Sequence, residues 1–131
     1  MRKISIQLIV LILISLFLFG CINENKSFDK DTRPTKNEVK HFVTNVLKGI
    51  SAEPSSVNVD FIGVILWHKD YGWVVPCNFT WVNMRGQKER QLWHFSIKGI
   101  AKYGVNILLE EQVDVIKSLP MNMVNYEYIV N

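Results

Sequence analysis

Nucleophilic or acid–base chemistry in this chain of 131 residues would depend on Cys77 and on three histidines, His41, His68 and His94. A cysteine nucleophile needs a histidine base and an exposed, electropositive setting. Cys77 instead lies on one face of an alternating apolar stretch, which predicts a buried and unreactive thiol. The histidines are 27 and 26 residues apart, without the short spacings of metal ligands on one helix or strand. We therefore expect neither a catalytic cysteine nor a metal site.

Acidic side chains are scattered, and Glu110-Glu111 is the only adjacent pair of carboxylates. We interpret this pair as the acidic first turn of a helix, where carboxylates complement the helix dipole. The chain has no glycine-rich phosphate loop, no Gly-x-Ser-x-Gly turn and no Walker sequence. We assign no catalytic residue and no cofactor, and we expect that the protein is not an enzyme. The alternative is an enzyme assembled from distant residues, which a cleft pairing a histidine with a carboxylate would favour.

Four tryptophans could line a pocket for a small molecule, because aromatic rings are common in such sites. Three of them share the apolar face of an expected β-hairpin, which favours core packing. A tryptophan exposed in a cleft beside polar groups would favour a ligand site instead. No ligand-binding residue is assigned among Trp67, Trp73, Trp81 and Trp93.

The other cysteine, Cys21, ends an apolar leader. Arg2 and Lys3 are followed by 17 residues without a charge, Ile4 to Gly20. As a helix this stretch would span about 25 Å, which is shorter than the roughly 30 Å hydrocarbon core of a bilayer. A positive start, an apolar run and a small residue before the cleavage point are typical of a removable signal peptide.

The residues Leu18-Phe19-Gly20-Cys21 resemble the lipobox of bacterial lipoproteins. Phe19 is bulkier than the residue that usually stands at its position. The resemblance implies that a diacylglycerol is attached to the Cys21 sulfur and that the chain is cut after Gly20. Acyl chains such as palmitate would then hold the protein, outside the cytoplasm, on the cell membrane or the outer membrane. The alternatives are an uncleaved signal anchor and an ordinary secretory signal.

The charge outside this leader is balanced, with 13 basic and 12 acidic side chains. Such a surface lacks the clustered cations of a nucleic-acid site, so no nucleic-acid partner is expected. With Cys21 acylated, Cys77 would have no partner for an intramolecular disulfide. The fold must therefore depend on its hydrophobic core.

These patterns divide the chain into a signal peptide over 1–20, a flexible tether over 21–37 and a single α+β domain over 38–131. The tether is assigned because residues 22–37 are polar, with almost no apolar side chain besides Ile22 and Phe28. The first expected helix runs from about Thr35 or Lys36 to Ile50. This helix has an apolar stripe, and Thr35-x-x-Glu38 has the spacing of a capping box.

Alternation with a period of two predicts strands after this helix, at 57–67, 73–82, 91–98 and 105–109. Pro76 cannot donate a backbone hydrogen bond, so its strand should lie at a sheet edge or carry a bulge. A second, short helix is expected over 110–119, before Pro120. The tail 121–131 alternates weakly and could form a last strand.

We therefore expect an α+β fold: an N-terminal amphipathic helix on a curved antiparallel sheet of about four strands, with a short second helix near the C-terminus. This order of elements is similar to cystatin-like and NTF2-like domains. The expected function is a non-catalytic, lipid-anchored binding or interaction module of the cell envelope. The membrane would be its partner through Cys21, together with an envelope protein. Alternatives are a small-ligand pocket of NTF2-like type and a strand edge offered to a partner, which Pro76 suggests.

Overall fold

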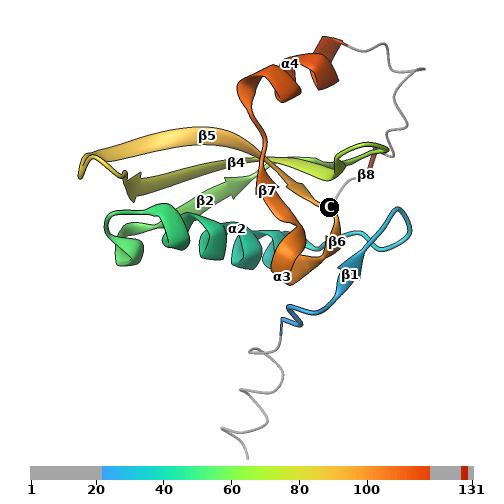
Figure 1. Cartoon of the computed structure of the whole chain (residues 1–131), viewed down its shortest axis with the longest axis horizontal. Coiled ribbons are helices and arrows are strands. Elements are labelled where there is room, and N and C mark those ends of the chain that lie inside the picture. The colour runs from blue at the N-terminus through green and yellow to red at the C-terminus, as the bar shows by residue number, and fades with distance from the viewer. Residues whose placement is uncertain (1–21, 119–127, 130–131) are drawn as a thin grey trace, which may run out of the picture.

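The computed structural model of the chain describes residues 22–118 and 128–129, and these residues form an α+β fold (Figure 1). The expected signal peptide, the lipidation residue Cys21 and most of the tail 121–131 lie outside the described residues. The described residues contain four helical segments: α2 (Lys36–Ile50), η1 (Pro54–Ser56), α3 (Ala101–Gly104) and α4 (Glu110–Ser118).

In the described part of the chain, the main sheet has six antiparallel strands, two more than the sequence suggested. Five of them follow the order β7-β5-β4-β3-β8, and β2 also pairs with β4. The strand expected over 57–67 is interrupted and forms both β2 and β3. The bounds are β2 (Asn58–Ile62), β3 (Ile65–His68), β4 (Gly72–Val82), β5 (Lys88–Ile97), β7 (Val105–Ile107) and β8 (Tyr128–Ile129).

Helix α2 covers one face of the sheet, which we call the inner face (Figure 1). Its start is held by a capping box, in which Thr35 accepts the Glu38 N–H and the Glu38 carboxylate accepts the Thr35 N–H. The apolar stripe of α2 is buried through Val39, Phe42, Val43 and Leu47. Burying this stripe against the sheet supplies the hydrophobic contact that stabilises the helix.

The inner face of the sheet is filled by alternate side chains of β4 and β5. All of the following are at most 4 % exposed: Trp73, Val75, Cys77, Phe79, Trp81, Phe95 and Ile97. The rings of Phe79, Trp81 and Trp93 meet edge to face, with centroids 5.0 to 5.4 Å apart. This packing shows why the alternation of apolar residues in β4 is so regular: one face of the strand is core along its whole length.

The segment expected to be a flexible tether is folded onto the domain from residue 22 to residue 37. Its strand β1 (Ser27–Phe28) pairs with β6 (Gly99–Ile100), and the side chain of Phe28 is fully buried against Phe42. The carbonyl of Asp29 also accepts the indole N–H of Trp73 over 2.7 Å. The tether interpretation is therefore wrong for these residues, because one large aromatic side chain and backbone hydrogen bonds dock an otherwise polar segment.

Pro76 lies in β4, an internal strand, so the expectation that its strand is a sheet edge is wrong. Its neighbour in β5 is His94. The Pro76 carbonyl faces the other side and accepts the N–H of Gly63, which lies between β2 and β3. The N–H and C=O of one strand residue point toward the same neighbouring strand. Because proline has no N–H, β4 lacks a backbone donor at the position that faces this interruption. The register shift in the sheet lies in β2, between Val59 and Phe61.

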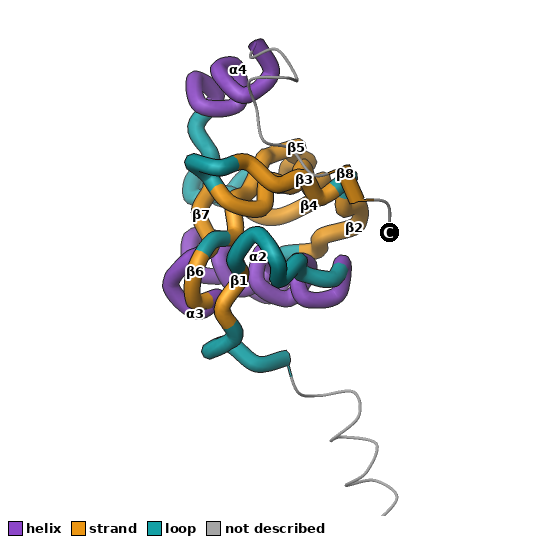
Figure 2. The backbone as a smooth tube through the Cα atoms, turned by 90° about the vertical axis from the view of Figure 1, so that its right-hand side faces the viewer, coloured by secondary structure: helices purple, strands orange, loops and turns teal. Residues whose placement is uncertain are grey.

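Among the described residues, α4 covers the opposite, outer face of the sheet, and it covers this face only in part. Helix α4 packs there through a small apolar cluster of Val74, Leu108 and Ile116, with Val113 and Tyr71 beside it. Figures 1 and 2 both show α2 and α4 on opposite sides of the sheet. The part of the outer face that α4 leaves open is where a binding site can form.

Candidate functional site

The residues that could perform covalent chemistry are not brought together. Cys77 is fully buried on the inner face, and burial raises the pKa of its thiol to about 12. Its neighbour in β5 is Trp93, whereas His94 lies opposite Pro76. Cys77 and His94 therefore point to opposite faces of the sheet, so His94 cannot act as a base for this thiol.

The other two histidines, His41 and His68, lie in different elements and contact different neighbours. His41 lies on α2, where its Nε2 is 3.5 Å from a Glu24 carboxylate oxygen and 3.2 Å from the Asn45 amide nitrogen. His68 is 2 % exposed at the end of β3, and its Nδ1 accepts the Asp70 N–H over 3.1 Å. Within residues 22–118 and 128–129, no cluster of three or more histidine, cysteine or acidic side chains could hold a metal ion.

The tryptophans belong mainly to the core. Trp67, Trp73 and Trp81 are at most 7 % exposed, and Trp93 is half-buried. Two of the indole N–H groups also have structural partners: that of Trp73 donates to the Asp29 carbonyl, and that of Trp81 donates to Glu89 Oε1 over 3.0 Å. This hydrogen bond is the main reason that the pKa of the Glu89 carboxyl is lowered. Packed rings with satisfied N–H groups are typical of a core.

A groove beside β5, at the edge of the sheet, is the best candidate for a functional site. It has a cavity volume of about 620 Å³ and lies between β5, the end of β7 and α4. Its lining combines apolar side chains with a histidine, two acids and a lysine. The lining residues are Gln91, Leu92, Trp93, His94, Ile107, Leu108, Leu109, Glu110, Val113, Asp114 and Lys117.

The groove exists because β7 is shorter than β5. Strand β7 pairs only with Phe95–Ile97, and the last backbone bond on this side runs from the Leu108 N–H to the His94 carbonyl. The chain then turns away and starts α4, where the Gln112 side chain accepts the Leu109 N–H over 2.8 Å. In the described part of the chain, β5 has no strand partner on this side from Lys88 to Trp93. The groove therefore runs beside an open strand edge.

Apolar side chains in the groove are accessible to a partner. Leu92 is 53 % exposed on the outer face of β5, and Leu109 is 62 % exposed at the start of α4. His94 also lines the groove, and its pKa is lowered first by burial and then by the positive charge of Lys117. A neutral imidazole and two exposed leucines favour contact with an apolar group.

The groove does not have the features of an acid–base catalytic site. Glu110 and Asp114 line it, but among the described residues no hydrogen bond or ion pair joins His94 to either carboxylate. A catalytic histidine is normally oriented by such a partner.

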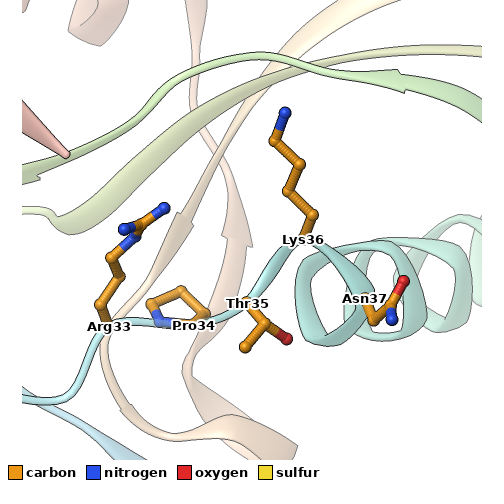
Figure 3. Close-up of a pocket in the computed structure, with 5 residues that line it drawn as sticks. All are labelled: Arg33, Pro34, Thr35, Lys36 and Asn37. Carbon is orange, nitrogen blue, oxygen red and sulfur yellow. The ribbon is translucent and has the colours of Figure 1, made fainter. Parts of the chain in front are cut away.

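A second hollow lies at the start of α2 and has a cavity volume of about 400 Å³. Figure 3 shows Arg33 and Lys36 extending to the same side of the chain above Pro34 and Thr35. The Arg33 atoms Nε and Nη2 are buried and have no hydrogen-bond partner among the described residues. Arg33 lies in the segment whose polar composition predicts a tether, so the sequence alone does not single it out as a site residue.

The groove was also not predicted from the sequence, although two signals for it were present. Leu92 and His94 share the outward face of an alternating strand, and residues 110–119 were expected to form an amphipathic helix. Neither signal tells which part of the sheet the helix covers.

Comparisons with protein-family models, curated proteins and solved structures found no match for this chain. Among the helices that the structure describes, none is both long and apolar enough to cross a membrane.

Proposed function

We propose that this protein is a lipid-anchored, extracytoplasmic binding module of the cell envelope, and that the groove beside β5 is its binding site. The single observation that carries the binding role is the open groove itself, with Leu92 and Leu109 more than half exposed beside a strand edge that has no partner among the described residues. Exposed apolar side chains around a concave surface are typical of interaction sites.

The partner that fits this groove is an extended segment of another envelope protein. The His94 carbonyl points to the open side of β5, so the N–H and C=O groups of Leu92 and Arg90 point there as well. A partner strand in line with β7 would satisfy these groups and could place an apolar side chain against Leu92 and Leu109. Such strand addition needs no catalytic group.

The anchor is proposed from the residues Leu18-Phe19-Gly20-Cys21, which resemble a lipobox. Mass spectrometry of the protein from its native host should find acyl chains on Cys21 and no residue before it. Cys21→Ser should release the protein from the membrane fraction, because two or more acyl chains supply most of the membrane affinity. An intact leader, or an unchanged membrane fraction of Cys21→Ser, would contradict the anchor.

The binding role is tested by photo-crosslinking in the native host. A benzoylphenylalanine at Leu92 should give an adduct with a partner protein, and the same residue at Met84 should not. Met84 is a matched control, because it is 79 % exposed at the turn between β4 and β5 but does not line the groove. Equal adducts at the two positions, or none at either, would contradict a binding site in the groove.

The strand-addition mode is tested with pairs of variants at an edge position. With the crosslinker at Leu109, the variant Arg90→Pro removes a backbone donor that faces the open side, whereas Arg90→Ala keeps it. Both variants lose the 3.0 Å ion pair with Asp60, so they differ in the backbone donor and in the fixed φ of proline but not in this ion pair. We expect a several-fold weaker adduct for proline than for alanine. Equal adducts would show that the partner binds the groove without adding a strand.

A further inference from the structure

We propose that one end of the domain rests on the surface of the bilayer that holds the acyl chains of Cys21. This end, the β6–α3 end, comprises residues 99–104. The inference rests on the lipid anchor proposed above and goes beyond it, because acyl chains alone would allow the domain any orientation. The occupant of this surface is the lipid–water interface of the anchoring membrane.

The β6–α3 end lies next to the residues that follow Cys21. The Lys102 N–H donates to the Glu24 carbonyl over 2.8 Å, and the Ala101 N–H donates to the Lys26 carbonyl over 2.9 Å. Glu24 is three residues from Cys21, and three residues of extended chain span at most about 11 Å. Ile22 is itself partly buried against the core. The acylated sulfur therefore cannot lie far from α3.

The side chains exposed at this end suit a lipid–water interface. Ile100 is 47 % exposed and Tyr103 is 75 % exposed. Tyrosine places its ring among lipid headgroups while its hydroxyl stays hydrated. The Lys102 ammonium lies 5.6 Å from the centre of the Tyr103 ring, where its apolar stem can lie along the interface and its charge can reach phosphate groups. An apolar residue, an aromatic ring and a lysine thus occur together beside the anchor.

This orientation leaves the groove accessible. Figures 1 and 2 both show α4 on the side of the sheet opposite to α3, β6 and β1. With the β6–α3 end on the membrane, the groove beside α4 would face away from the bilayer and toward other envelope proteins. The resting surface and the binding site would then lie at opposite ends of the domain.

Spin-label accessibility in vesicles tests this orientation. The lipidated protein would be reconstituted in vesicles of phosphatidylcholine and phosphatidylglycerol, with a nitroxide on Tyr103→Cys or, as a control, on Met84→Cys. The acylated Cys21 and the buried Cys77 leave the introduced cysteine as the reactive thiol. At Tyr103 we expect several-fold more collisions with oxygen and several-fold fewer with a water-soluble nickel complex than for the Cys21→Ser protein. At Met84 we expect no change.

A label at a second position covers the case in which the loss of the Tyr103 ring itself detaches the β6–α3 end from the membrane. Asn25→Cys places the nitroxide in the exposed segment beside Glu24 and leaves Tyr103 intact. Its accessibility to nickel should be low in vesicles and should rise in Tyr103→Glu, while the protein stays bound to the vesicles. If the labels at Tyr103 and Asn25 both remain accessible to nickel while the protein is bound to vesicles, the proposed orientation is wrong. The lipid anchor would not be contradicted by this result. Protein that does not bind vesicles would overturn the anchor.

Discussion

Gly63 donates its N–H to the carbonyl oxygen of Pro76 over 2.8 Å, and this bond bridges the interruption between β2 and β3. The two residues also fit each other sterically, since a Cβ added to Gly63 would lie 2.5 Å from the Pro76 Cγ. A proline in an internal strand is thus accommodated by a glycine in the facing chain. On the same side of β4, β2 and β3 pair with the strand before and after this contact.

The first prediction follows from this contact. Gly63→Ala should lower the free energy of unfolding by about 1–3 kcal/mol, the usual effect of overpacking a tight site. Gly49→Ala is the control, because its added Cβ would meet nothing within 4 Å in helix α2. The control should be stabilised by about 0.5–1 kcal/mol. Urea unfolding measures both, and a neutral Gly63→Ala would show that the close approach is not present in solution.

The second prediction concerns the segment docked by β1. Phe28→Ala should lower the free energy of unfolding by about 3–5 kcal/mol, because it leaves a cavity against Phe42 in the core. Phe61→Ala is the matched control, since Phe61 is 52 % exposed on the outer face, and it should change stability by less than about 0.5 kcal/mol. If Phe28→Ala had the same free energy of unfolding as Phe61→Ala, residues 22–37 would be a tether and not a docked segment.

The third prediction concerns pH. Burial lowers the pKa of His68 from 6.5, and the nearby charges of Lys69 and Lys98 lower it further, against the opposing effect of Asp70. Its Nδ1 accepts the Asp70 N–H, which requires an unprotonated nitrogen. The unfolded chain therefore binds this proton more tightly, so stability is full above about pH 6.5 and falls as the pH drops below it.

The variant His68→Gln isolates this effect. The pKa of His94 is also lowered, so the wild type should lose stability through both groups as the pH falls from about 8 to about 5. His68→Gln should be less stable at high pH but should lose less on acidification. Urea unfolding at several pH values measures the difference. An identical pH dependence in the two proteins would contradict a neutral His68 in the fold.

The fourth prediction concerns Cys77. Because its thiol is fully buried and its pKa is raised to about 12, almost no thiolate is present near neutral pH. Iodoacetamide should therefore leave Cys77 unmodified in native buffer and should modify it completely in guanidinium chloride. The denatured sample serves as the positive control. Rapid modification of the native protein would reverse the assignment of this thiol to the core.

Local patterns in the sequence were sufficient for the elements whose signals depend on near neighbours. The Thr35-x-x-Glu38 spacing predicts the capping box at the start of α2, and the alternation in 73–82 predicts the buried face of β4. Gly72, at the turn between β3 and β4, has a positive φ of 80°, a conformation that glycine adopts without a steric penalty. Each of these features is decided by residues within about one turn of helix or one strand.

Only the tertiary structure decided where these elements meet. Residues 22–37 have no periodicity, and one buried side chain, Phe28, together with pairing to β6, places them on the domain. Pro76 is internal because Gly63, 13 positions earlier, leaves a gap opposite it. The groove depends on how far β7 runs along β5 and on where α4 packs. Contacts between segments far apart in the chain follow from packing and leave no local pattern of residues.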